Sequence, residues 1–182
     1  MLNRLFSRRK YQSIAGSLYA AIMAQARQAH FYARWSVPDT LDGRFEMLVV
    51  HAFLVIRRIK GCDETGRKVE QALFDHMFSD LDQAIREAGV SDVAVPRKIK
   101  AMASAFYGRA AHYEEALAEA DAQALVRVIA RNVFPDAGGS GNAGALGAYM
   151  RRTIDVLESQ PDRALIAGRV EFCAPEDEAT EK

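Results

Sequence analysis

The sequence has few cysteines and no excess of charge of either sign, and both facts exclude whole classes of protein. Its 182 residues include two cysteines, Cys62 and Cys173, which form no C-x-x-C pair. This excludes the usual pattern of a zinc site, a thioredoxin-like motif or a disulfide-stapled secreted fold, and it predicts free thiols in a reducing compartment. The 24 basic residues cancel the 24 acidic ones, so no broad attraction to nucleic acid is expected.

The chain also lacks an apolar run long enough to cross a membrane. Its most hydrophobic stretch, 45–56, is about twelve residues long and contains Glu46 and His51, whereas a span needs roughly twenty apolar residues. The basic segment 1–10 has no uninterrupted apolar region and no small-residue cleavage site, so no secretory signal is predicted. We therefore expect 45–56 to belong to a buried core helix.

Hydrophobic residues recur at helical spacing along most of the chain, and no segment alternates as a half-buried strand does. The predicted helices are about 9–30, 42–60, 66–88, 96–119, 122–132 and 143–160. The helix at about 42–60 is apolar almost all round, so the other helices have to bury it. The sequence thus predicts an all-α fold, a single-domain bundle of about six helices around this central apolar helix.

The helical domain is expected to span 11–172, with less regular segments at its edges. The basic segment 1–10 precedes it, and the glycine-rich segment 135–142 predicts a flexible loop within it. The aromatic stretch 31–37 precedes Pro38 and predicts an irregular connection. The acidic tail 173–182 has no core pattern and is expected to be disordered.

No catalytic or metal-binding fingerprint is present, so neither a cofactor nor a metal is expected. The glycines at 138–141 follow a predicted helix and lack the lysine of a phosphate-binding loop. Among the four histidines, His76 alone has a carboxylate, Asp80, at i, i+4 spacing. Asp75, Asp80 and Asp82 leave two interpretations open: a solvated helix face, or the acid–base group of a helical enzyme of quinone or lipid metabolism.

Two groups of basic residues suggest contacts with acidic partners. Lys98 and Lys100 lie at the start of the predicted helix 96–119, where the helix dipole disfavours cations, so an acidic partner, an internal ion pair or an unpaired surface charge all fit. Segment 1–10 mixes leucine and phenylalanine with arginine and lysine. This composition predicts a weak, salt-sensitive contact with an anionic membrane, or a frayed terminus.

Three blocks of sequence follow one another in a specific order. The first, at 38–60, is P-D-T-L-D-G-R-F-E-M-L-V-V-H-A-F-L-V-I-R-R-I-K. The second, at 73–92, is L-F-D-H-M-F-S-D-L-D-Q-A-I-R-E-A-G-V-S-D, and the third, at 97–113, is R-K-I-K-A-M-A-S-A-F-Y-G-R-A-A-H-Y. In order and spacing these blocks resemble the ubiquinol-cytochrome c chaperone family, and the resemblance covers roughly 37–132.

The resemblance implies a non-enzymatic assembly factor for respiratory complex III that engages newly made cytochrome b. It further implies a small partner protein and a contact with the ribosome near its exit tunnel, as in mitochondrial members of the family. Because segment 1–10 lacks the serine-rich amphipathic character of a mitochondrial presequence, we expect a bacterial member, located in the cytoplasm and peripheral to the inner membrane.

A chaperone for an apolar client needs an exposed groove that accepts a helix. We expect the predicted helices 66–88 and 96–119 to line it, because their aromatic residues exceed what two apolar stripes require. The candidate client- or partner-binding residues are Phe74, Phe78, Phe106, Tyr107, Gly108, Arg109, Tyr113, Lys98 and Lys100. The alternative is that these aromatic residues simply fill the core.

The first block opens with four residues for which two roles remain open. Asp39, Asp42, Gly43 and Arg44 precede or begin the central helix. They can cap it and form a local ion pair, or they can form a contact patch.

Overall fold

The computed structural model describes residues 2–135 and 140–176, and every regular element in them is a helix. The elements are α1 (Leu2–Ala26), α2 (Ala29–Ala33), α3 (Leu41–Lys60), α4 (Glu64–Glu87), α5 (Val95–Ala118), α6 (Ala122–Val133), α7 (Ser140–Ser159) and α8 (Asp162–Leu165). The prediction of an all-α bundle is confirmed.

Helix α3 is the central rod that the sequence predicted. From Glu46 to Ile56 every residue is buried, and α3 contacts α1, α4, α5, α6 and α7. Thr40 caps its start, because the Thr40 side chain accepts a hydrogen bond of 3.1 Å from the amide of Gly43. Because other helices surround the stretch from Glu46 to Ile56, apolar residues occupy nearly all of its sides.

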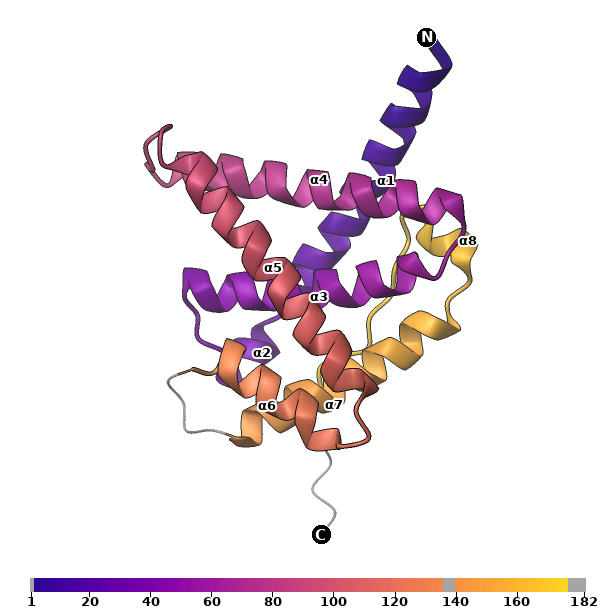
Figure 1. The fold of residues 1–182 in the computed structure, drawn as a ribbon. Coiled ribbons are helices and arrows are strands. Elements are labelled where there is room, and N and C mark those ends of the chain that lie inside the picture. The colour runs from indigo at the N-terminus through magenta and orange to yellow at the C-terminus, as the bar shows by residue number, and fades with distance from the viewer. Residues whose placement is uncertain (1, 136–139, 177–182) are drawn as a thin grey trace.

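The remaining helices cover α3 from several directions. In Figure 1, α4 runs across the top of α3, α5 descends in front of it, and α6 and α7 lie below. Helix α1 packs against α4 and α3, and its N-terminal end extends beyond the rest of the bundle.

Helix α1 departs from the prediction at both ends. It begins at Leu2, so residues 2–10 of the basic segment are the first part of α1 and not a separate segment. No glycine or proline interrupts the helix there. It ends at Ala26 because Gln28 adopts an extended backbone, and the short α2 then occupies part of the predicted irregular connection.

The C-terminal third corrects two further boundaries. Helix α7 begins at Ser140, earlier than predicted, while residues 136–139 of the glycine-rich loop lie outside the described residues. The chain remains packed beyond the predicted boundary at 172: Gln25 donates a hydrogen bond of 3.1 Å to the carbonyl of Cys173, and Pro175 is buried. Residues 177–182 of the predicted acidic tail lie outside the described part.

Candidate functional site

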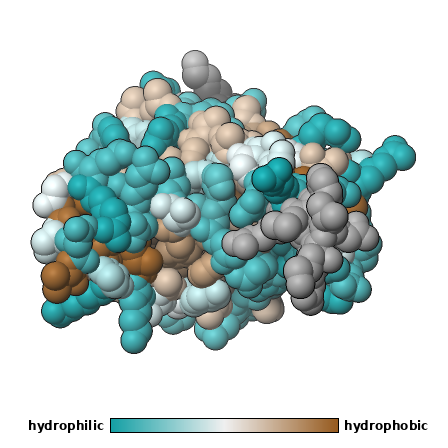
Figure 2. All heavy atoms as spheres, turned by 90° about the horizontal axis from the view of Figure 1, so that it is seen from above, coloured by the Kyte–Doolittle hydropathy of each residue, from teal (hydrophilic) through white to brown (hydrophobic). Residues whose placement is uncertain are grey.

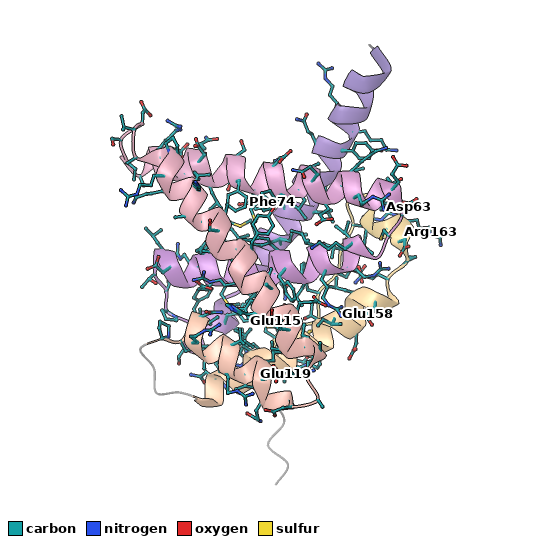
Figure 3. All side chains as sticks on the ribbon, viewed as in Figure 1. Asp63, Phe74, Glu115, Glu119, Glu158 and Arg163 are labelled. Carbon is teal, nitrogen blue, oxygen red and sulfur yellow. The ribbon has the colours of Figure 1, made fainter. Side chains whose placement is uncertain are left out.

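Four aromatic side chains from α4 and α5 form one cluster, which we call the outer aromatic cluster. Its members are Phe74, Phe78, Phe106 and Tyr107. The ring of Phe74 lies between the two helices and has its centroid 4.5 Å from that of Phe78 and 5.1 Å from that of Tyr107 (Figure 3). The structure therefore brings together residues that are adjacent on each helix but about thirty positions apart in sequence.

The outer aromatic cluster is buried on its inner side and open on its outer side. Phe106 is 3% exposed and Phe78 is 9% exposed, whereas Tyr107 is 60% exposed and Phe74 is half-buried. Seen from above, brown apolar atoms lie among teal ones at the end of the molecule where α4 turns into α5 (Figure 2), and Val93 in this turn is 91% exposed. Two of the rings, Phe78 and Phe106, fill the core, whereas Phe74 and Tyr107 reach the surface. Each of the two roles considered from the sequence, core filling and client binding, therefore fits half of the cluster.

Two clefts in the described part of the chain lie away from this cluster, and the exposed groove expected between α4 and α5 stays a prediction. One cleft, of about 1140 Å³, lies between α1 and α4 and is lined by polar residues such as Gln12 and Arg67. The other, of about 540 Å³, lies between α6 and α7 next to Trp35.

Tyr113 does not belong to this surface, which corrects its place among the candidate residues. It is fully buried, and its ring packs against Phe53 of α3 with centroids 5.5 Å apart. Burial raises the pKa of its hydroxyl well above the ordinary value. The heptad between Phe106 and Tyr113 keeps both rings on the inner face of α5.

Arg109 is turned inward and joins α5 to α3. Its Nε donates a hydrogen bond of 2.6 Å to Glu46 Oε2, and its Nη2 pairs with Glu46 Oε1. The guanidinium also lies 6.0 Å from the centroid of the Phe45 ring. Burial raises the pKa of Glu46, and the hydrogen bond from Arg109 opposes that rise.

Lys98, Lys100 and Gly108 lie on the exposed side of α5. Lys100 precedes Tyr107 by seven positions, so both occupy the same face of the helix. A Cβ placed on Gly108 would meet no atom within 4 Å, so packing within the chain does not require glycine there.

The motif that opens α3 has a structural explanation. Thr40 is the cap, the side chains of Asp39 and Arg44 form an exposed ion pair of 2.7 Å, and Asp42 is exposed in the first turn. Gly43 is buried, and a Cβ there would lie 2.0 Å from the carbonyl oxygen of Pro38, which a backbone cannot accommodate. The Thr40 cap, the Asp39–Arg44 pair and the position of Asp42 in the first turn support the role in capping and a local ion pair.

The carboxylates considered for catalysis do not converge. Asp75 accepts a hydrogen bond from Gln71, and Asp82 pairs with Arg86. Asp80 instead accepts a hydrogen bond of 2.7 Å from the hydroxyl of Tyr19 on α1. Burial, and to a smaller extent this hydrogen bond, raises the pKa of Tyr19. Each carboxylate therefore has its own partner in a different direction.

The described residues contain neither a metal centre nor a membrane-spanning helix. Across residues 2–135 and 140–176, no three side chains from histidine, cysteine, aspartate and glutamate gather in a way that could hold a metal ion. In the same part of the chain, no helix combines the length and the apolar character that crossing a membrane requires.

A second aromatic group, which the sequence did not reveal, lies on the opposite side of α3. This inner aromatic cluster comprises Phe31, Trp35, His51, Tyr149 and Phe172. His51 Nδ1 donates to the carbonyl of Met47 at 2.7 Å, and the Tyr149 hydroxyl donates to His51 Nε2 at 2.9 Å. Gln25 Nε2 in turn donates to the Tyr149 hydroxyl at 2.9 Å.

Burial decides the protonation of the inner cluster. His51 is fully buried, which lowers its pKa to about 4, so the imidazole is neutral at pH 7. The carbonyl of Met47 can only accept a hydrogen bond, so the proton of the neutral imidazole lies on Nδ1. The sequence signal was a single polar ring inside the most apolar helix, but its partner Tyr149 stands 98 positions away.

The fold and the surface together define a helical bundle that exposes part of an aromatic cluster on α4 and α5. A family model described as ubiquinol-cytochrome C chaperone matches residues 33–172. The chain belongs to this family, and the resemblance noted in the sequence is confirmed.

Known proteins agree with this assignment. The crystal structure of the Cbp3 homolog from Brucella abortus superposes with a TM-score of 0.84 and 40% identity, covering 96% of this chain and 98% of that one. The ubiquinol-cytochrome c reductase complex assembly factor 1 of Mus musculus is 23% identical over 171 residues, which is 92% of this chain and 57% of the relative. The protein of the same name from Homo sapiens is also 23% identical, with 56% of its length covered. The chain therefore spans somewhat more than half the length of these two relatives.

Proposed function

We propose that this chain is a non-catalytic chaperone that binds newly made cytochrome b and assists assembly of the cytochrome bc complex, respiratory complex III. The family assignment supports the chaperone role, and relatives named as assembly factors of ubiquinol-cytochrome c reductase support the target complex. The client surface in this proposal is the exposed side of the outer aromatic cluster.

The exposure of Tyr107 is the observation that carries the choice of surface. A tyrosine that is 60% exposed next to the half-buried ring of Phe74 leaves aromatic area in water. Aromatic residues supply much of the binding energy in protein interfaces, because they bury large areas at low entropic cost. An apolar helix of a client would cover this area.

The residues around Tyr107 are also suited to binding a client helix. Gly108 has open space where a side chain would stand, which permits close approach of a client backbone. Lys98 and Lys100 are exposed two turns earlier, where they meet the polar flank or the anionic lipid headgroups beside a membrane subunit. Arg109 supports the surface from below by holding α5 on α3.

The test is a pull-down from detergent-solubilised membranes with tagged full-length protein. The unmodified chain is expected to recover cytochrome b without the mature complex. Tyr107→Ala is expected to lose most of that recovery, whereas Val93→Ala, which shortens a 91% exposed apolar side chain at the α4–α5 turn, keeps it. Equal recovery with Tyr107→Ala would refute the surface, and recovery of no hydrophobic subunit by the unmodified chain would refute the function.

The proposal places the protein at the cytoplasmic face of a bacterial inner membrane, where its client is inserted. The basic start of α1 is the element proposed to contact anionic lipid weakly. Co-sedimentation with vesicles containing anionic lipid, absent with neutral vesicles and lost at about 0.5 M salt, is the expected result. A small partner protein and the ribosome remain further proposed contacts, which the same pull-down would identify.

A further inference from the structure

The last described segment of the chain, residues 169–176, crosses the bundle without forming a helix or a strand, and we call it the strap. It follows Gly168, whose φ of 82° suits glycine and whose Cβ position lies 3.2 Å from the carbonyl oxygen of Ile14. In Figure 1 the strap is the yellow line that leaves α8 and returns toward α7. Side chains from α1, α3 and α7 contact it.

Most of the hydrogen bonds that hold the strap are made to its backbone. Gln160 donates from Nε2 to the carbonyl of Glu171 at 2.9 Å, and its Oε1 accepts from the amide of Glu171 at 2.9 Å. Gln25 donates to the carbonyl of Cys173 at 3.1 Å. The Gln160 side chain thus bonds both the carbonyl and the amide of one strap residue. Such bonds to the backbone are suited to binding an extended peptide.

The side chains of the strap also contact the bundle. The ring of Phe172 packs edge-on against His51, with centroids 5.6 Å apart. The thiol of Cys173 lies 3.0 Å from the Thr153 hydroxyl, and Pro175 is buried. An aromatic residue, a small residue and a proline therefore fit at successive places along the groove.

The floor under the strap is polar, although it lies in the apolar core. His51, Tyr149 and Gln25 form the buried hydrogen-bonded chain of the inner aromatic cluster, and Gln25 continues it to the strap. Aliphatic residues would fill a permanent wall without the desolvation cost of buried polar atoms. This floor is polar, and its last member, Gln25, donates a hydrogen bond to a strap carbonyl. It is therefore suited to binding a peptide backbone.

We propose that the groove between α1, α3 and α7 is a binding site for an extended peptide, and that the strap occupies it as an intramolecular ligand that can leave while the bundle stays folded. The ligand class is an extended segment with the pattern aromatic, small, small, proline seen at 172–175. This site is separate from the α4–α5 surface and does not depend on the proposed client.

The two cysteines allow release of the strap to be measured in the full chain. Cys62→Ser leaves Cys173 as the probe on the strap, and Cys173→Ser leaves the buried Cys62 as the probe of the bundle. Each is reacted with a disulfide reagent at increasing urea, and rates are corrected for the reactivity of the same thiol in the unfolded chain. Cys173 is expected to react at least 100-fold faster than Cys62, with a rate that hardly changes with urea below the unfolding transition. Equal rates and equal urea dependence would overturn the proposal.

A variant distinguishes release from simple exposure of the thiol. Gln160→Ala removes both hydrogen bonds to Glu171 and is expected to accelerate labelling of Cys173 roughly tenfold without changing that of Cys62. Gln71→Ala, an exposed glutamine on α4, is the matched control and should change neither rate. No acceleration by Gln160→Ala would overturn the proposal.

Direct binding tests the site itself. A fluorescent synthetic peptide of residues 169–176, carrying Cys173→Ser, is titrated with the full chain and with Phe172→Ala, after circular dichroism has verified that the variant is helical. Phe172→Ala, whose own strap is weakened, is expected to bind the peptide at least tenfold more tightly than the unmodified chain, and not to bind a peptide that lacks the phenylalanine. Absence of binding to the variant, or equal binding to both peptides, would overturn the proposal.

Discussion

The two aromatic clusters on either side of α3 differ in what surrounds them. The outer cluster is made of residues on α4 and α5 and ends in the exposed Tyr107. Its other three rings are phenyl groups, which carry no hydrogen-bonding atoms. The inner cluster draws on α2 and the segment after it, on α3, on α7 and on the strap. Hydrogen bonds join His51 to Tyr149, and Tyr149 to Gln25 of α1.

Similar aromatic side chains therefore have different roles in the two clusters, according to their burial and their hydrogen bonds. The buried rings of α2, α3 and α7, two of which also carry hydrogen bonds, fix the relative positions of these helices, so their loss is expected to destabilise the fold. A ring left in water contributes little to folding and is available for a partner. Four changes test this difference.

The largest effect is expected inside the inner cluster. Phe31 is fully buried against Trp35, His51 and Tyr149, so Phe31→Ala removes a large side chain and leaves a cavity. The free energy of unfolding should fall by about 4 kcal/mol. Urea unfolding followed by circular dichroism measures it, and a loss below about 1 kcal/mol would mean that the inner cluster is loosely packed.

The inner cluster should also make stability depend on pH. The pKa of His51 is lowered to about 4 in the folded protein, whereas the unfolded chain takes up that proton near 6.5. The contribution is therefore fully present above pH 6.5 and is lost as pH falls toward 4, by roughly 3 kcal/mol in total. Subtracting the pH profile of His51→Gln isolates this term from the carboxylates, and parallel profiles would contradict it.

The ion pair beneath the outer cluster should have an intermediate effect. Arg109→Met leaves the carboxylate of Glu46 buried without its partner. Breaking a buried pair is strongly destabilising, but the Arg109 side chain is 26% exposed, so we expect about 2 kcal/mol. Adding Glu46→Met should restore most of the loss in thermal unfolding. If the double variant is as unstable as the single one, the pair is not the cause.

The smallest effect on stability is expected at the exposed end of the outer cluster. Tyr107→Ala should change the free energy of unfolding by less than about 0.5 kcal/mol, because most of the side chain is already in water. The same variant is the one expected to lose cytochrome b in the pull-down. A large destabilisation would show that Tyr107 belongs to the core, as Phe106 does.

Local patterns in the sequence predicted the helices but not all of their ends. The spacing of apolar residues located α3 to α7, and the composition of α3 predicted its burial. The start of α1 at Leu2 was missed because basic residues there weakened the apolar pattern, and its end at Ala26 depends on the backbone of Gln28. Helix propensity alone does not decide such ends.

The candidate site was predicted in part. Spacing brought Phe74, Phe78, Phe106 and Tyr107 onto two facing helices, but it could not tell that Tyr107 points outward. Tyr113 was wrongly included because an inward stripe and a binding stripe have the same period. The partners of Asp80 and Arg109, Tyr19 and Glu46, stand 61 and 63 positions away, beyond the reach of any local pattern.

The sequence by itself determined an all-helical chain, a central rod that others must bury, and membership of the ubiquinol-cytochrome c chaperone family through three ordered blocks. The tertiary structure alone decided which rings face water, which carboxylate meets which cation, and where the strap lies. Helical periodicity is a property of neighbours along the chain, whereas burial and pairing arise when distant segments pack together, so only the packed molecule determines them.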